Sequence, residues 1–108
     1  MSGSFEDLDV PPTLVSFAVT TSKTDYIVSP EFKAPGHRVI MLTPRHNEFR
    51  LPDTSSLLKV FDKVTELLRS GKAVSCYTPG MGGTGEALMK MAFGNGIGIT
   101  VKIGRAHV

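Results

Sequence analysis

Hydrophobic and polar positions alternate over two stretches of the chain, which predicts two strands. In Thr13–Thr21, Val15, Phe17 and Val19 share one face, and in Ile97–Ile103 isoleucine and valine alternate with smaller or polar residues. Shorter apolar runs at Val39–Leu42 and Ala73–Tyr77 predict two further strands. Four strands are therefore expected, with the third and fourth separated from their predecessors by helical segments.

A different period predicts a long helix that runs to about Arg69. Asp53, Thr54 and Ser55 offer N-cap chemistry at its start, and Gly71 is expected to end it. Its apolar residues recur at steps of three and four and form one stripe: Leu57, Leu58, Val60, Phe61, Val64, Leu67 and Leu68. The charged residues between them are expected to face solvent.

A second, shorter helix is predicted over Gly85–Phe93, capped by Gly83 or Thr84 and ended by Gly94-Asn95-Gly96. The resulting order is β, β, α, β, α, β. It predicts an α+β fold in which one mixed sheet carries both helices on one face, related to ferredoxin-like arrangements. The other face would stay open, which suggests that a partner layer is missing.

The remaining segments are expected to be connections. Met1–Pro12 is predicted to be an extended lead-in, Tyr26–Val28 a short edge strand, and Arg45–Leu51 a surface loop. Glu31 and Lys33 flank Phe32 in a loop, and the plainest interpretation is a local ion pair beside a phenylalanine that plugs the core.

Composition limits the functions to be considered. The 108 residues (11.6 kDa) suffice for one domain, and the +2 net charge is scattered along the chain. With aromatic residues at 7% and no tryptophan, nucleic-acid binding is not expected. No apolar run approaches the ~20 residues of a membrane helix, so a cytoplasmic protein without membrane contact is expected. The single cysteine, Cys76, excludes an internal disulfide and a cysteine-pair zinc site.

Candidate chemistry concentrates in the glycine loop, Ala73–Glu86, which holds four of the eleven glycines. Gly80–Gly85 matches G-x-G-x-x-G between a predicted strand and a predicted helix. Three interpretations stay open: a dinucleotide site, a phosphate contact by the loop amides and the helix N-terminus with the Thr84 hydroxyl, and a structural turn. No acidic residue follows to hold a ribose, and no Gly-Lys-Ser/Thr follows to make a Walker loop.

No catalytic residue and no metal site are predicted. Cys76 is expected to be a small core residue within a strand. His37, His46 and His107 lack a ligand-like spacing and are expected in surface loops. No Ser-His-Asp or paired-carboxylate arrangement can be assembled.

Several strings together resemble one known family. SFEDLDVPPTLVSFAV, SPEFK, LLKVFDKVTELLRSGK and SCYTPGMGGTGEALMKMAFGNGIGI are similar to the second aminoimidazole-ribonucleotide-synthase-like C-terminal domain of phosphoribosylformylglycinamidine synthase. The resemblance covers roughly Met1 to Ile99. It implies that Met1-Ser2-Gly3 stand at an internal cut and that the chain is a truncated piece of a longer enzyme. Residues 104–108 do not extend it and are expected to be a vector-derived tail.

The resemblance implies a role in purine biosynthesis. Enzymes of this family use ATP and magnesium to phosphorylate the amide oxygen of formylglycinamide ribonucleotide, and ammonia from glutamine displaces the phosphate to give formylglycinamidine ribonucleotide. Their HDxSDGGL motif begins a helix whose glycines can meet a substrate phosphate. Gly82 and Gly83 match the glycine pair, whereas Tyr77-Thr78 and Gly80-Met81 replace the His-Asp and Ser-Asp pairs. The loop is then either that of a subfamily with its own chemistry or that of a degenerate half of the enzyme.

Three hypotheses for the function follow. The first is a domain fragment of this ligase, inactive alone, without bound ATP or magnesium, and partnered by the remaining domains of the parent enzyme. The second is a free-standing α+β module that forms a homo-oligomer through its open sheet face. The third is a nucleotide-binding domain that uses the G-x-G-x-x-G loop.

Overall fold

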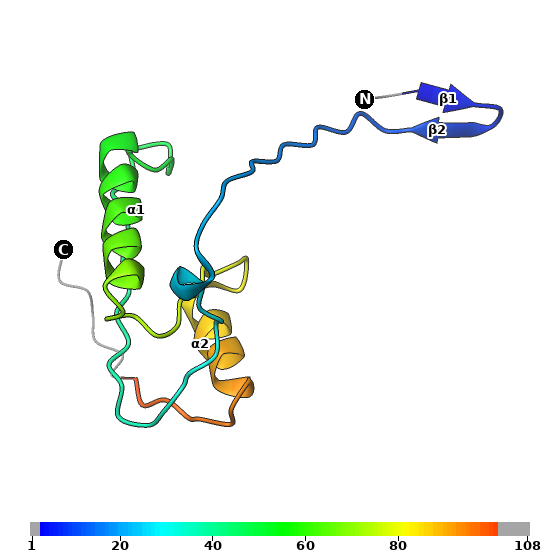
Figure 1. Ribbon diagram of the computed structural model, residues 1–108. Helices are drawn as coiled ribbons and strands as arrows, with labels where there is room; N and C mark the ends of the chain where they lie inside the picture. The colour runs from blue at the N-terminus through cyan, green and yellow to red at the C-terminus, as the bar shows by residue number, and fades with distance from the viewer. Residues whose placement is uncertain (1–2, 102–108) are drawn as a thin grey trace.

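The computed structural model describes residues 3–101 and is an α+β protein with two α-helices and one two-stranded antiparallel sheet (Figure 1). The coarse prediction of an α+β chain with two helices is confirmed. The predicted tail at residues 104–108, and with it His107, lies outside the described residues.

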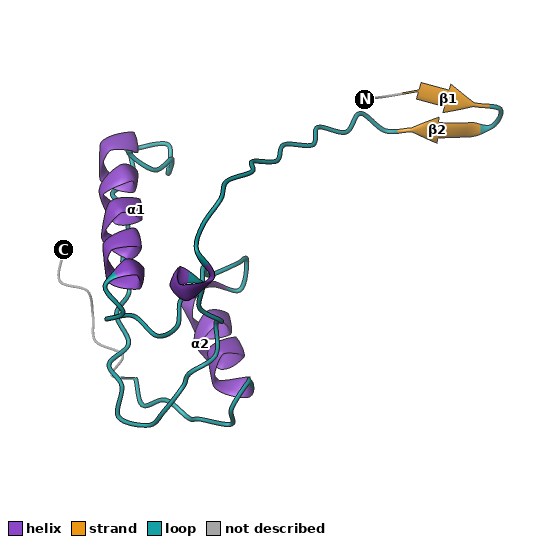
Figure 2. Cartoon of the chain, in the orientation of Figure 1, coloured by secondary structure: helices purple, strands orange, loops and turns teal. Residues whose placement is uncertain are grey.

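The N-terminal sheet is a hairpin, whereas an extended lead-in without a strand pair was expected over Met1–Pro12. β1 (Gly3–Phe5) pairs with β2 (Leu8–Val10) so that Gly3 faces Val10 and Phe5 faces Leu8. The chain reverses at Glu6, whose φ is +52°. Residues other than glycine seldom adopt a positive φ, so a glutamate at this position does not predict a turn from the sequence. The hairpin stands away from both helices at the end of an extended segment (Figure 2).

The long helix confirms its prediction at both ends. α1 (Thr54–Arg69) begins after Asp53, whose carboxylate accepts the Ser56 amide hydrogen as an N-cap. At the other end Gly71 adopts a φ of +72°, the left-handed conformation in which glycine carries no Cβ penalty. The amides of Ser70, Gly71 and Ala73 then donate to the carbonyls of Glu66, Leu68 and Leu67 at 3.0–3.2 Å. The last turn of α1 is therefore closed by its own chain.

The second helix begins earlier than predicted. α2 spans Gly83–Phe93, and Gly82 is its N-cap in place of Gly83 or Thr84. Gly83 has a φ of +71°, and its amide donates to the Gly80 carbonyl at 3.0 Å. This turn lets the helix start within the glycine run, two residues before Gly85.

The buried residues gather around one face of α2. Phe32, Ala87 and Met91 form the buried hydrophobic core. The Phe32 amide donates to the Met91 carbonyl at 2.9 Å, and the Asn95 side chain donates to the Phe32 carbonyl at 2.8 Å. The prediction of Phe32 as a core plug is confirmed, and so is the Glu31–Lys33 ion pair beside it.

Hydrogen bonding to Lys33 and Ser29 lowers the pKa of Glu31 to about 2. The loop that carries Phe32 therefore rests on α2 by main-chain hydrogen bonds and holds its own charges in a local cluster. The charged groups of this cluster, those of Glu31 and Lys33, lie outside the core.

The predicted ββαβαβ sheet is not confirmed. Within residues 3–101, the segments expected as strands at 13–21, 39–42 and 73–77 belong to no β-ladder, and neither does the described part of 97–103, whose last two residues lie outside the described range. The short edge strand expected at Tyr26–Val28 is not formed either, because Tyr26 is the last residue of a 3-10 helix (Thr24–Tyr26) and Ile27 is its C-cap. The pattern predicts strands whose two faces are partly apolar, and such strands need neighbours on both edges and cover on both faces. Two helices cannot provide that cover.

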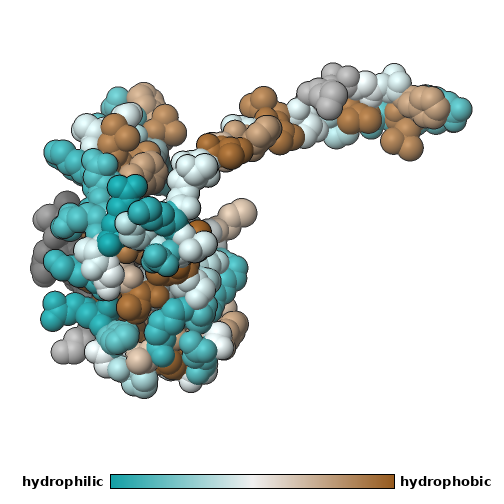
Figure 3. Space-filling view, viewed as in Figure 1, coloured by the Kyte–Doolittle hydropathy of each residue, from teal (hydrophilic) through white to brown (hydrophobic). Residues whose placement is uncertain are grey.

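Apolar side chains are consequently exposed along the extended segments. Leu14 is 96% exposed and Phe17 is 85% exposed, and Figure 3 shows hydrophobic residues along the arm that leads to the hairpin. Cys76 is also exposed, so its expected burial is wrong. In its segment Ala73, Ser75 and Tyr77 are half-buried while Val74 and Cys76 face outward, which keeps the period of two without a sheet.

The overall dimensions agree with this exposure. The Cα radius of gyration is 18.6 Å, whereas about 13 Å is typical of a compact domain of this length. The accessible surface is 9897 Å², against roughly 5,800 Å² for a compact monomer of this mass. The chain alone therefore does not bury the apolar surface that its sequence carries.

Candidate functional site

The three residues predicted to meet a phosphate lie together at the start of α2. Gly82 is the N-cap, and Gly83 and Thr84 are the first two helical residues. Amide groups at a helix start favour anions because they lack intrahelical acceptors and lie at the positive end of the helix dipole. The local architecture expected from the sequence is present, so the question is what these amides contact.

The anion at this helix start is supplied by the chain itself. The Gly82 amide donates to Glu86 Oε2 at 2.6 Å, and Glu86 in turn forms an ion pair with Lys90 one helical turn further on. The Gly83 amide is engaged by the Gly80 carbonyl. A phosphate that approached Gly82 would have to displace a carboxylate from the same donor.

Electrostatics hold this carboxylate in its ionised form. Hydrogen bonding to Lys90, then to the Gly82 amide, lowers the pKa of Glu86 below its ordinary value of 4.5. The same contact with Glu86 raises the pKa of Lys90. Near neutral pH the helix start therefore faces a negative charge whose own counter-ion is Lys90.

Glycine at position 82 is required by this arrangement. A Cβ added there would lie 1.9 Å from Glu86 Oε2 and 2.7 Å from Glu86 Cβ. At Gly85, by contrast, a Cβ would meet nothing within 4 Å. The two glycines thus differ in role, although both contribute to the G-x-G-x-x-G pattern.

The Thr84 hydroxyl makes a long-range contact with Met41. Its Oγ1 lies 3.6 Å from Met41 Sδ, which brings the segment around Val39–Leu42 to the start of α2. Sulfur is a weak acceptor, so this contact leaves the hydroxyl easy to redirect. Neither Glu86 nor Met41 was assigned to the site from sequence. The four-residue step from Gly82 to Glu86 was the signal available for the first of them.

Other candidate chemistry is sparse in the described part of the chain. His37 and His46 are exposed in loops, as predicted, and His46 forms an isolated bridge with Pro52. Residues 3–101 contain no group of three or more His, Cys, Asp or Glu side chains that could hold a metal ion. None of the helices in that range is long and apolar enough to cross a membrane.

Comparisons with known proteins found no match to this chain. No protein-family model, no curated protein and no solved structure matches it. Functional inference therefore rests on the residues and their arrangement.

Proposed function

We propose that this chain is part of a C-terminal-type domain of a phosphoribosylformylglycinamidine synthase, and that it works beside other domains of that ATP-dependent ligase in purine biosynthesis. The structural observation that carries this proposal is the exposed apolar surface of the extended segments. The radius of gyration of 18.6 Å and the accessible surface of 9897 Å² are larger than those of a compact chain of this length, because much of the apolar surface is not packed against other residues. Partner domains would cover this apolar surface.

The sequence strings that resemble this family are the second support. They include the helix now observed as α1 and the Met91-Ala92-Phe93 end of α2. In the assembled domain we expect residues 13–21, 39–42, 73–77 and 97–103 to pair as the mixed sheet of the ββαβαβ order. The alternation of half-buried and exposed residues along Ala73–Tyr77 is compatible with that pairing.

The glycine loop has a structural role in this proposal. Glu86 already occupies the Gly82 amide, and the family's two carboxylate-bearing pairs are replaced at Tyr77-Thr78 and Gly80-Met81. A substrate phosphate would reach Gly82, Gly83 and Thr84 only after Glu86 releases the Gly82 amide, with its ion pair to Lys90 kept. ATP and magnesium belong to the parent enzyme, and the described residues offer no cluster to hold the metal.

The coding sequence on both sides of this segment tests the proposal. We expect an open reading frame that continues into a glutaminase domain with a catalytic cysteine and into an ATP-binding half. Stop codons directly flanking the segment would contradict it. The purified chain mixed with formylglycinamide ribonucleotide, ATP, magnesium and ammonia should form no product, and turnover would show that the segment is not a dependent part.

A free-standing module is the second candidate, because the same exposed apolar residues could be covered by a second copy of the chain. Light scattering after size-exclusion chromatography distinguishes the two. A defined dimer with cooperative unfolding supports the module, whereas open-ended association supports the dependent domain. No observation favours the nucleotide-binding alternative over these two.

A further inference from the structure

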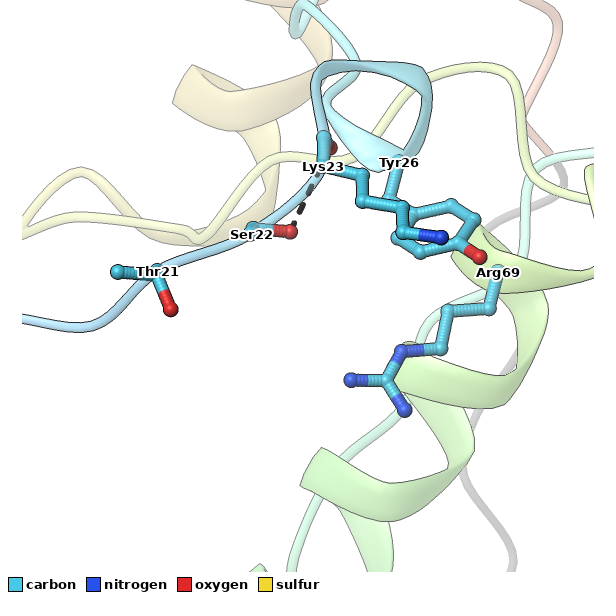
Figure 4. A pocket seen from close by; sticks show the side chains of 5 residues that line it. All are labelled: Thr21, Ser22, Lys23, Tyr26 and Arg69. Atoms are coloured by element: carbon cyan, nitrogen blue, oxygen red, sulfur yellow. Dashed lines mark hydrogen bonds between the residues drawn. The ribbon is translucent and has the colours of Figure 1, made fainter.

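A hollow between the Thr24–Tyr26 turn and the end of α1 gathers basic and hydroxyl groups. It has a volume of about 360 Å³ and is lined by Thr21, Ser22, Lys23, Tyr26 and Arg69. Figure 4 shows the first four on one side of the hollow and Arg69 reaching in from α1. An adjoining hollow of about 230 Å³ shares four of these residues and is extended by Thr20, Thr65 and Leu68.

Local structure fixes both walls of this hollow. On one side the Tyr26 amide donates to the Lys23 carbonyl at 3.0 Å, and the Ile27 amide donates to the Thr24 carbonyl at 3.1 Å, which forms the 3-10 turn. On the other side Arg69 is the last residue of α1, and its Cζ lies 5.9 Å from the centre of the Tyr26 ring. A cation at this distance from an aromatic ring is attracted to it, which ties the two walls together.

The two cations of the hollow are not neutralised. Lys33, Lys63 and Lys90 each form an ion pair, whereas within residues 3–101 neither Lys23 nor Arg69 has a carboxylate within salt-bridge distance. Asp25 and Glu66 are close in sequence, but neither lines the hollow, and Glu66 is held by Lys63 at 3.0 Å. The hollow therefore carries a local positive charge that the chain does not balance.

The helix end beside Arg69 does not oppose an anion strongly. The carbonyls of Glu66, Leu67 and Leu68 accept hydrogen bonds from Ser70, Ala73 and Gly71. These contacts satisfy the groups that give a helix C-terminus its partial negative charge. Hydroxyl groups of Thr21, Ser22 and Tyr26 also line the hollow beside the two cations. The Ser22 hydroxyl donates to the Lys23 carbonyl at 3.5 Å, a long contact that an incoming acceptor would replace (Figure 4).

We propose that this hollow binds the phosphate group of a small phosphorylated metabolite, with Arg69 and Lys23 as the charged ligands and the hydroxyls of Thr21, Ser22 and Tyr26 as additional donors. Arginine suits this role because its planar donors match phosphate oxygens, and lysine adds a point charge. The site is distinct from the glycine loop and does not depend on the function proposed above.

Amide NMR titration of the full chain with glycerol 3-phosphate tests the proposal. Saturable shifts are expected at residues 21–26 and 65–70, with a dissociation constant on the order of millimolar, since the groups are exposed and screened. Potassium chloride at matched ionic strength should produce no such localised shifts. The absence of saturable shifts would overturn the site, and shifts confined to Gly82–Thr84 would assign anion binding to the glycine loop instead.

Matched variants sharpen the result. Lys23→Gln and Arg69→Gln should each weaken binding by about fivefold, the size expected of an exposed ion pair. Lys59→Gln, on the solvent side of α1 and outside the hollow, should leave binding unchanged. Circular dichroism spectra equal to that of the unsubstituted chain show that each variant is folded, and equal weakening by Lys59→Gln would contradict a local site.

Sedimentation with vesicles separates a free metabolite from a lipid headgroup. Phosphatidylcholine vesicles with and without phosphatidic acid should retain the chain equally. Retention by phosphatidic acid, together with no response to glycerol 3-phosphate, would overturn the metabolite as the phosphate source.

Discussion

Single glycines at the start of α2 carry different constraints, and two substitutions separate them. Gly83→Ala forces a Cβ into a φ of +71°, which should cost ~1–2 kcal/mol. Gly85→Ala lies within α2, meets nothing within 4 Å, and should stabilise by up to ~1 kcal/mol. Urea unfolding followed by circular dichroism measures both. Equal effects would contradict the assignment of Gly83 to the left-handed conformation.

The Glu86 carboxylate should make the stability of α2 depend on pH. Because its contacts lower the folded-state pKa, their stabilising effect is present above the unfolded value of 4.5 and is lost as pH falls through the lower folded pKa. Glu86→Gln should remove this part of the acid sensitivity. Other carboxylates titrate in the same range, so the readout is the difference between the two pH profiles, and identical profiles would show that Glu86 does not cap the helix.

Individual residues were predicted best where one local interaction decides their conformation. Asp53, Gly71 and Phe32 behave as expected because a cap, a left-handed stop and an apolar plug each depend on near neighbours. The predicted burial of Cys76 was wrong because it depends on a sheet that residues 3–101 do not form. At the candidate site Gly82, Gly83 and Thr84 were placed correctly at a helix start, while the Glu86 and Met41 contacts with them were missed.

Among the elements, both helices were predicted and the strands were not confirmed. A helix satisfies its main-chain groups internally, so the pattern over Thr54–Arg69 is sufficient to specify α1. A strand satisfies them through a neighbour, so the alternation over Thr13–Thr21 specifies a face without supplying a partner. The hairpin formed by β1 and β2 was missed because its turn uses Glu6 rather than a glycine.

The attachment of the Phe32 loop to α2 yields a prediction for these elements. Phe32→Ala removes a side chain from the small core around Ala87 and Met91 and should destabilise the chain by roughly 3 kcal/mol, whereas Phe32→Leu should cost less. Gly94→Ala should loosen the same junction, because its Cβ would lie 2.4 Å from Glu31 Cβ. Thermal unfolding measures these effects, and a tolerated Phe32→Ala would show that this junction does not hold the loop.

The molecule as a whole exposes more apolar surface than a stable monomer of its length usually does. An extended segment that forms no β-ladder within residues 3–101 and exposes Leu14, Val15 and Phe17 is a template for pairing with another chain. The surface is expected to be covered, either by other domains, as in the proposed function, or by further copies of the chain. This makes association in solution the most direct global property to measure.

Phe17→Ser should therefore lower the association of the purified chain. Phe49→Ser is the matched control, because Phe49 is 75% exposed and Phe17 85%, yet Phe49 lies in the short loop before α1, away from the extended segment. Sedimentation velocity over a range of concentrations should show larger species for the unsubstituted chain and for Phe49→Ser, and a shift toward monomer for Phe17→Ser. A chain that stays monomeric at every concentration would contradict the expectation that this segment needs a partner. Equal shifts in the two variants would assign association to general hydrophobicity rather than to residues 13–21.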